Sequence, residues 1–253
     1  MITRRNMLLG GAAVSLSGCT LLDGLTGGSP LRAFLQQAEG LTMAAQRALL
    51  GDRLAPEFTE ADIRQGQRPN GSTNVTSDDY VGLQQSGFAG YALQVTGLVE
   101  TPLSIPYAQL TALPARTQIT RHDCVEGWSC IAKWTGVPLS MILDQAKPLM
   151  TARYAVFHCF DAIEHTLSGD VLYYESIDMV DARHPQTILA WGMNDQPLPV
   201  ANGAPIRLRV ERQLGYKMAK YVKSIELVDS FAGLGSGRGS YWADRGYEWY
   251  AGI

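Results

Sequence analysis

The densest group of chemically active side chains in the sequence surrounds Cys124. His122 and Asp123 precede this cysteine, and Glu126 and Trp128 follow it. A thiolate is a soft ligand that suits a soft metal centre, so this group predicts that Cys124 binds a metal. The alternative is a buried free cysteine that packs as a small hydrophobic residue. The residue types alone leave both interpretations open.

The role of His122 depends on the local backbone. In an extended chain, residues two apart point to the same face, so His122 would share a face with Cys124 and could line a substrate pocket or contact a cofactor. Arg121 would point to the other face, as an ordinary surface arginine does. The alternative for His122 is a histidine that packs in the core or lies on the surface. The other nearby cysteine, Cys130, is expected in the core.

The composition excludes several classes of protein. The 253 residues are 46% hydrophobic and 18% charged, which is typical of a globular protein of one large or two small domains. The net charge is −3 and lysines and arginines form no tract, so no nucleic-acid partner is expected. The four cysteines contain no C-x-x-C pair, which argues against a disulfide scaffold, a zinc ribbon and haem attachment.

Residues 1–30 have the pattern of an export signal. Arg4 and Arg5 precede an apolar run that continues through Leu16. Paired arginines before such a run are typical of the twin-arginine pathway, which carries folded proteins. The signal predicts export to the periplasm.

A second feature of this segment is a candidate lipidation site. The sequence Leu-Ser-Gly-Cys at 16–19 is similar to a bacterial lipobox, in which Cys19 would carry the lipid and anchor the protein to a membrane. The alternative is a plain signal peptide cut nearby. Residues 20–30 are typical of a Gly/Ser tether. Residues 31–253 are then expected to form a single domain.

The remaining sequence mixes strands with few helices. Helical spacing at 31–50 predicts a helix that packs on the core, and the polar residues 57–79 are typical of a binding loop. No regular βαβ alternation is present, which predicts an α+β fold. Strands are expected at 91–99, 118–123, 152–159, 206–210 and 222–229. A strand and a turn are expected within 102–113, and strands or a short helix at 168–174 and 187–194. A helix is expected near 139–146, after a break in the chain at 135–138.

The C-terminal residues 233–253 combine glycines with large aromatic side chains. Leaving these rings in water would cost free energy, so the tail is expected to pack on the domain rather than remain a flexible end. The aromatic residues are Tyr241, Trp242, Tyr247, Trp249 and Tyr250.

Four motifs occur in one order along the chain: CVEGWS at 124–129, WTGVPL at 134–139, NGAPIRLRV at 202–210 and LGYKMAKYVKSIEL at 214–227. Together they resemble the oxidoreductase molybdopterin-binding domain of the sulfite oxidase superfamily. The chain is most similar to the bacterial exported branch that includes the catalytic subunit of the periplasmic methionine sulfoxide reductase. The Asn-Arg-Arg element typical of sulfite oxidases is missing. The resemblance implies a sulfite-oxidase-type α+β fold with mixed sheets and few helices.

The same resemblance implies a cofactor and the residues that hold it. It implies one molybdenum atom bound by the dithiolene of a molybdopterin and by the thiolate of Cys124. Cys159 stands where the reductase branch has a threonine, and the segment 218–220 matches the part that binds the cofactor phosphate. The implied cofactor contacts are Asn70, Cys124, Cys159, Asn202, Arg207, Lys217, Met218, Ala219 and Lys220.

These residues also have ordinary interpretations. The lysines at 217, 220 and 223 could form a solvated basic face, and Arg207 could lie on a strand surface. Asn202 with Gly203 is by itself a hairpin turn, and Asn70 is by itself a turn former.

The implied activity is a two-electron oxygen-atom transfer on a small substrate such as a sulfoxide or sulfite. The cofactor would carry out the electron and oxygen transfer. The sequence contains no C-x-x-C-H motif and no iron–sulfur cysteine set. Electrons are therefore expected to pass to or from a membrane b-type or a soluble c-type cytochrome. The alternative is a noncatalytic, lipid-anchored binding module that keeps the fold, because fold and function are separable.

Overall fold

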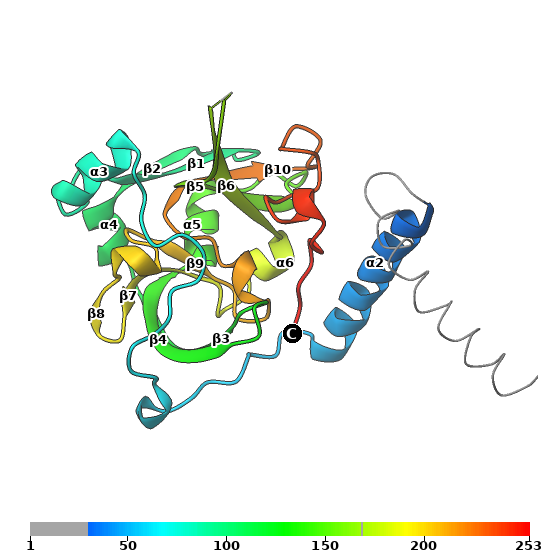
Figure 1. Cartoon of the computed structure of the whole chain (residues 1–253), viewed down its shortest axis with the longest axis horizontal. Helices are drawn as coiled ribbons and strands as arrows, with labels where there is room; N and C mark the ends of the chain where they lie inside the picture. Colours follow the sequence, from blue (N-terminus) through cyan, green and yellow to red (C-terminus); the bar gives the residue numbers. More distant parts are fainter. Residues whose placement is uncertain (1–29, 168) are drawn as a thin grey trace, which may run out of the picture. The chain divides into compact units, whose positions relative to one another are not determined.

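Two five-stranded β-sheets form the framework of residues 52–253 (Figure 1). The computed structural model describes residues 30–167 and 169–253. In the first sheet β1 pairs with β10 in parallel, whereas every other pair is antiparallel. The strand order is β2-β1-β10-β5-β6. The strands are β1 (Ala92–Gly97), β2 (Leu103–Pro106), β5 (Tyr154–Thr166), β6 (Gly169–Asp178) and β10 (Val222–Val228).

The second sheet is antiparallel and carries the Cys124 region. Its order is β3-β4-β7-β8, and β9 also pairs with β7. The described chain adds only short helices to these sheets in residues 52–253, which confirms the α+β prediction. The strands are β3 (Arg116–Asp123), β4 (Ser129–Pro138), β7 (Ile188–Met193), β8 (Gln196–Pro197) and β9 (Arg207–Arg209), and the α-helices are α3 (Asp78–Gln85), α4 (Tyr107–Ala112), α5 (Leu139–Ala146) and α6 (Met179–Ala182).

The helix predicted near 139–146 is confirmed as α5, but the predicted chain break before it is wrong. Strand β4 continues through this segment to Pro138. A Cβ at Gly136 would lie 2.2 Å from the carbonyl oxygen of Leu189, so glycine is required where β7 approaches closely. Proline can end the strand and begin α5 because its missing N–H is not needed there.

Two other sequence predictions need correction. The turn expected after the strand within 102–113 is the helix α4, which follows β2 directly. The end of the predicted binding loop at 57–79 already belongs to α3. Both helices are short and carry few buried side chains, so their apolar periodicity is weak.

A strap, defined here as residues 52–77, runs along the second sheet. The N–H of Phe58 donates to the carbonyl of Ile119 (2.8 Å), and the N–H of Arg64 donates to the carbonyl of Ile131 (3.1 Å). The strap contains the single 3-10 turn η1 (Glu60–Asp62) and is otherwise irregular within the described residues. These bonds lead its last residues toward the turn between β3 and β4.

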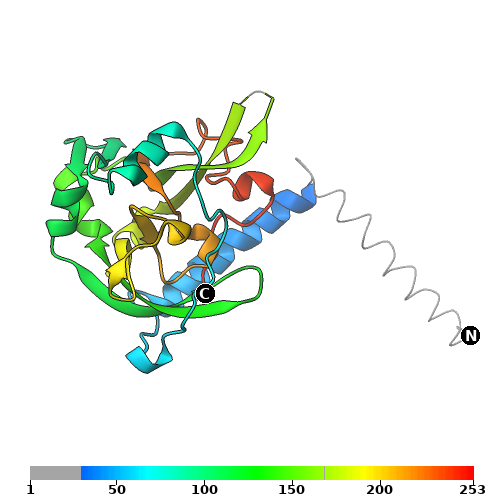
Figure 2. The ribbon, with the colours of Figure 1, turned by 60° about the vertical axis from the view of Figure 1, so that its left-hand side comes forward.

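The C-terminal tail packs on the domain, as its aromatic residues predicted. The N–H of Tyr241 donates to the carbonyl of Tyr174 in β6 (3.0 Å), and the N–H of Leu214 donates to the carbonyl of Ala251 (2.9 Å). Tyr241 is 2% exposed. Figure 2 shows the tail in red beside the β5–β6 hairpin.

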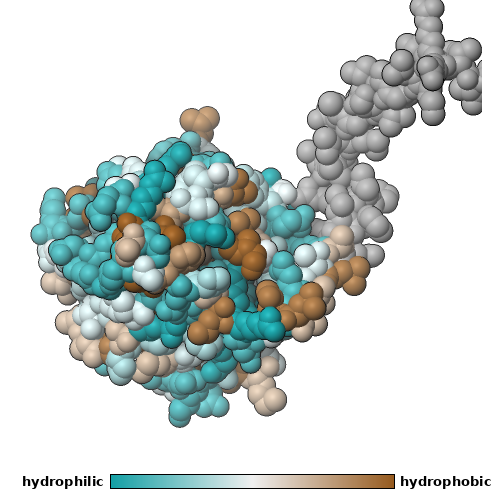
Figure 3. Space-filling view, turned by 90° about the horizontal axis from the view of Figure 1, so that it is seen from below, coloured by the Kyte–Doolittle hydropathy of each residue, from teal (hydrophilic) through white to brown (hydrophobic). Residues whose placement is uncertain are grey.

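Residues 1–51 form a separate unit, whose described part is the helix α2 (Pro30–Leu50). This helix confirms the helical prediction for 31–50, and its packing on a core stays a prediction. Arg4, Arg5 and Cys19 lie outside the described residues. Among the helices of the described part, none has the length and apolar character to span a bilayer. Figure 3 shows one face of the molecule, on which hydrophobic areas are separated by hydrophilic residues.

Candidate active site

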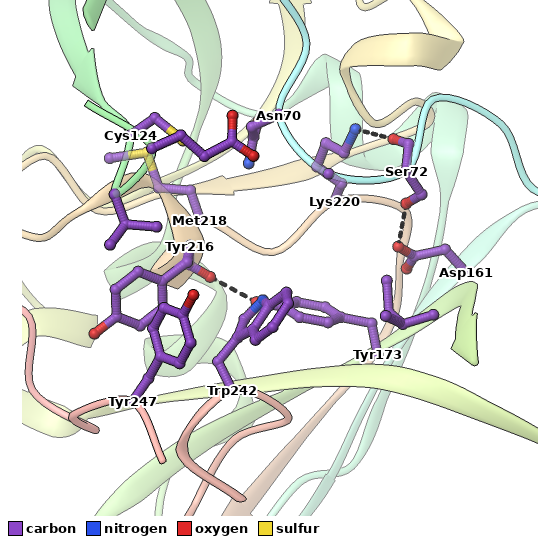
Figure 4. A pocket seen from close by; sticks show the side chains of 14 residues that line it. Asn70, Ser72, Cys124, Asp161, Tyr173, Tyr216, Met218, Lys220, Trp242 and Tyr247 are labelled. Atoms are coloured by element: carbon purple, nitrogen blue, oxygen red, sulfur yellow. Dashed lines mark hydrogen bonds between the residues drawn. The ribbon is translucent and has the colours of Figure 1, made fainter. Parts of the chain in front are cut away.

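Cys124 lies in the turn between β3 and β4, at the strand end where the sequence placed it. The N–H of Cys124 donates to the carbonyl of Trp128 (2.9 Å), and the N–H of Gly127 donates to the carbonyl of Cys124 (3.0 Å). Gly127 has a φ of 84°, a value that favours glycine. The turn holds Cys124 at the wall of a cavity of about 150 Å³ (Figure 4). Burial raises the pKa of its thiol, and a bound metal would reverse this effect by stabilising the thiolate.

The cavity has a polar end and an aromatic side. Figure 4 shows Asn70, Ser72, Lys220 and Asp161 at the polar end, while the rings lie along the opposite side. Cys124 lies near the junction of the two. The lining residues come from the strap, the β3–β4 turn, β5, β6, the 214–220 segment and the tail: Asn70, Gly71, Ser72, Cys124, Val125, Glu126, Asp161, Ile163, Tyr173, Tyr216, Met218, Lys220, Trp242 and Tyr247.

Lys220 supplies the positive charge of the polar end. Its ammonium donates to the carbonyl of Ala201 (2.8 Å) and to the carbonyl of Ser72 in the strap. Ser72 in turn donates its hydroxyl to Asp161 (2.5 Å). Burial, followed by the nearby Arg207, lowers the pKa of Lys220 to about 7. An anion bound beside the ammonium would raise this pKa again.

Arg207 lies directly behind the cavity wall and is 1% exposed. Its guanidinium donates to the carbonyl of Asn202 (2.9 Å), to Oδ1 of Asn70 (3.4 Å) and to the carbonyl of Met218 (3.4 Å). It lies over the ring of Trp134, 5.0 Å from the centroid. Burial, and then the second arginine of β9, lower the pKa of Arg207 to about 9. The guanidinium thus joins the strap to the 202–218 region.

His122 is buried behind the same site but is not among the described residues that line the cavity. Nη1 of Arg209 donates to its Nδ1 (3.1 Å), so the neutral imidazole carries its proton on Nε2. Its ring lies 5.5 Å from that of Trp128. Burial, and then Arg209, hold the pKa of His122 well below its usual value. Arg121 is exposed, as predicted from its position on the other face.

The polar end fits the cofactor that the sequence resemblance implies. Among the described residues, Nδ2 of Asn202, Nε of Arg207 and Nε2 of His122 are buried and have no hydrogen-bond partner. Neither Arg207 nor Lys220 forms an ion pair with a carboxylate in the described ranges. Buried unpaired donors and cations are costly. Such a site is therefore suited to an anionic ligand rich in acceptors, such as the phosphate and pterin of molybdopterin.

The protein itself offers no ready-made metal cage in its described part. No group of three His, Cys, Asp or Glu side chains converges within those residues. A metal held by Cys124 would therefore take its other ligands from a non-protein group, as the dithiolene of molybdopterin provides. A single cysteine at the wall of a cavity with one cation at its polar end is consistent with that arrangement.

Two residues implied as cofactor contacts lie elsewhere. Lys217 is fully buried and forms an ion pair with Glu175, and its ammonium also donates to the carbonyl of Ser176 (2.8 Å). Cys159 is 1% exposed in the core, with its thiol 3.8 Å from the carbonyl of Phe157. The 3-10 turn η3 (Gly215–Lys217) directs Lys217 away from Lys220. Neither lines the cavity.

The other predicted contacts are gathered at or behind the cavity wall. Asn70, Met218 and Lys220 line it, and Asn202 lies behind it. Ala219 contributes its buried backbone, whose carbonyl accepts from Leu208 (2.8 Å). A solvated basic face is excluded for Lys217 and Lys220, because both are buried; the third lysine of that run is exposed.

Several lining residues were not predicted from the sequence. Ser72 and Asp161 are brought together from the strap and β5, and neither belongs to a recognisable motif. The aromatic side consists of Tyr173, Tyr216, Trp242 and Tyr247. The aromatic content of the tail indicated packing, but gave no sign that two of its rings would line this cavity.

Comparisons with known proteins agree with this geometry. The family described as the oxidoreductase molybdopterin binding domain matches residues 81–232. A protein of Azospira oryzae is 36% identical over 250 residues, covering 98% of this chain and 86% of its own; its provisional name is protein-methionine-sulfoxide reductase subunit YedZ1. The sulfane dehydrogenase SoxCD of Paracoccus pantotrophus has a similar fold, with a TM-score of 0.50 and 21% identity over 60% of this chain and 45% of that chain.

The extent of the family match, together with the relative's identity over nearly the whole chain, decides the assignment. The alternative of a noncatalytic module is not favoured by a site that keeps Cys124, the buried cations Lys220 and Arg207, and buried donors without partners. The chain belongs to the oxidoreductase molybdopterin-binding family and is an oxidoreductase with a molybdenum–molybdopterin cofactor.

Proposed function

We propose that this chain is an exported enzyme that reduces neutral sulfoxides, with electrons supplied by a separate cytochrome. In this reaction the S–O bond breaks, the oxygen leaves as water, and the sulfur takes up two electrons while two protons are consumed. The bound cofactor supplies the two-electron change and the oxygen-atom transfer. Cys124 would bind its molybdenum, while Arg207 and Lys220 would hold its anionic part.

The observation that carries this proposal is the lining of the cavity next to Cys124. Its described lining contains aromatic and apolar side chains but no arginine, and its single cation, Lys220, belongs to the polar end. The nearest charged lining group is Glu126, two residues from Cys124. A carboxylate there would repel sulfite and other oxyanions, whereas it would not oppose a neutral sulfoxide.

Glu126 is held at the rim of the cavity by two contacts. Nε1 of Trp128 donates to it (2.9 Å), and Arg68 of the strap forms an exposed ion pair with it (3.3 Å). An exposed pair of this kind is weak and screened by salt, so Arg68 offers little binding energy to an anionic substrate. The name of the Azospira oryzae relative supports the same substrate class.

Export and electron supply complete the proposal. The twin arginines at 4 and 5 support transport of the folded, cofactor-loaded protein to the periplasm, and Cys19 would anchor it to a membrane if the lipobox is used. A membrane b-type or soluble c-type cytochrome would supply the electrons, because the sequence has no haem-attachment motif or iron–sulfur set of its own.

The test is to purify the exported protein, measure its molybdenum, and assay it with reduced viologen against methionine sulfoxide and with ferricyanide against sulfite. We expect sulfoxide reduction to dominate, and Cys124→Ser to abolish it while pterin remains bound. Cys130→Ala is the matched control, because Cys130 is buried in β4 and is not among the residues lining the cavity. Faster turnover of sulfite than of sulfoxide, or no molybdenum in the matured protein, would contradict the proposal.

A further inference from the structure

The C-terminal tail contributes two side chains to the cavity although it follows the region that matches the family. The family match ends at residue 232, whereas Trp242 and Tyr247 line the cavity on the side across from Cys124 (Figure 4). The cofactor-binding residues all precede the tail. The tail therefore shapes the space left for a substrate rather than the site for the cofactor.

A short 3-10 turn brings the two tail rings together. The turn η4 (Ala243–Arg245) is followed by Gly246, whose φ of 99° allows the chain to reverse. The N–H of Tyr247 then donates to the carbonyl of Trp242 (3.0 Å). The ring centroids of these two residues are 5.0 Å apart with an angle of 47° between the planes.

Tyr216 extends this pair into a continuous surface, which we call the aromatic wall (Tyr216, Trp242 and Tyr247). Its ring is 5.4 Å from that of Tyr247, in an edge-to-face arrangement of 73°. Its hydroxyl donates to the carbonyl of Glu248 in the tail (2.8 Å). The wall thus joins the 214–220 segment, which follows the cofactor-binding strand, to the tail.

The tail is fixed by polar contacts away from the cavity. The hydroxyl of Tyr174 donates to Asp244 (2.6 Å), and Nε1 of Trp249 donates to the hydroxyl of Ser176 (2.8 Å). The ring of Trp249 also lies 5.4 Å from that of Phe231. These contacts hold the wall in one position before any substrate binds, which lowers the entropic cost of recognition.

We propose that the aromatic wall is the specificity determinant of this enzyme and selects neutral sulfoxides that carry an apolar or aromatic arm on sulfur. The arm packs on Trp242 and Tyr247, since sulfur and apolar groups make favourable contacts with aromatic rings. Tyr247 lines the cavity and is 40% exposed, so a longer arm can extend past it toward solvent. This inference rests on the proposed sulfoxide reductase activity.

The experiment compares kcat/KM for methyl p-tolyl sulfoxide with kcat/KM for dimethyl sulfoxide, which has no large arm. We expect Trp242→Ala to lower the ratio of the two values by roughly 10-fold or more, the size of effect that loss of a hydrophobic subsite produces. Tyr247→Ala should lower the same ratio. Ile253→Ala is the control: this side chain lies in the same tail, is exposed and does not line the cavity, so the ratio should stay unchanged.

A binding measurement separates recognition from catalysis. Methyl p-tolyl sulfide, the reduced product, should quench the tryptophan fluorescence of the wild-type protein, and Tyr247→Ala should bind it more weakly. If Trp242→Ala does not fold, Trp242→Phe replaces it and should show a smaller loss of selectivity. A wild-type enzyme that reduces no sulfoxide would overturn both proposals. Normal sulfoxide reduction with an unchanged substrate ratio in the Trp242 and Tyr247 variants would overturn only the aromatic wall.

Discussion

Replacing Lys220 with methionine should weaken cofactor binding while leaving the cofactor-free protein at least as stable at pH 7. Burial lowers the pKa of Lys220 from the ordinary value of 10.5 to about 7, a penalty on the ammonium of about 5 kcal/mol. The substitution removes this penalty but leaves the carbonyl of Ala201 without its donor, at a cost of about 1–3 kcal/mol. A charged group bonded to a phosphate contributes about 1.5–3 kcal/mol, so retention of the cofactor should fall by roughly 10- to 150-fold.

The same lysine predicts a pH dependence of the cofactor-free protein. The unfolded chain keeps the proton of this lysine up to a pKa of 10.5, whereas the folded protein releases it at about 7. Between these values the unfolded state binds more protons, so the free energy of unfolding rises with pH. The expected slope from this group is about 1.4 kcal/mol per pH unit, and it should be absent in Lys220→Met.

The assay is denaturant unfolding of cofactor-free protein at pH 7 and 9, together with molybdenum and pterin content of the loaded protein after dialysis. Lys223→Met is the control, because Lys223 is exposed and pairs with Asp79 at the surface (3.2 Å). It should change neither the pH slope nor the cofactor content. An unchanged pH slope in Lys220→Met, or unchanged cofactor retention, would refute the reasoning.

Two further predictions concern residues around the cavity. Gly215→Ala would place a Cβ 2.3 Å from Nε2 of His122, and should lower the free energy of unfolding by about 1–3 kcal/mol; a thermal shift of nearly zero would show that the contact relaxes freely. Lys217→Met should destabilise the protein by about 3–5 kcal/mol, because it leaves the buried carboxylate of Glu175 without its cation. The folded fraction of Lys217→Met should keep a normal molybdenum content, and selective loss of cofactor would instead assign this lysine to the phosphate.

The sequence predicted the elements that have strong local signals. The strands expected at 91–99 and 152–159 correspond to β1 and the start of β5, and the helical spacing at 31–50 gave α2. Strand β4 was missed because glycine and proline at 136 and 138 suggested a break. That glycine is explained only by the close approach of β7, a contact with no signal in the local sequence.

The residues of the candidate site were likewise predicted only in part. Motif order singled out Cys124, Arg207 and Lys220, and the structure brings all three to the wall of one cavity or directly behind it. It could not separate Lys217 from Lys220, since a 3-10 turn sends one into the core beside Glu175 and the other to the cavity. Side-chain direction in irregular segments depends on backbone angles that residue spacing does not reveal.

The sequence by itself determined that this protein is an α+β molybdopterin oxidoreductase with a cysteine at its centre. Those features depend on residue chemistry and on motif order, which are properties of the linear chain. Only the tertiary structure decided what shares a cavity with that cysteine: Asp161 from β5, Ser72 from the strap, and Trp242 and Tyr247 from the tail. These segments are far apart in sequence and are brought together by burial of apolar surface over the whole domain, so no local pattern could have indicated the shape of the substrate space.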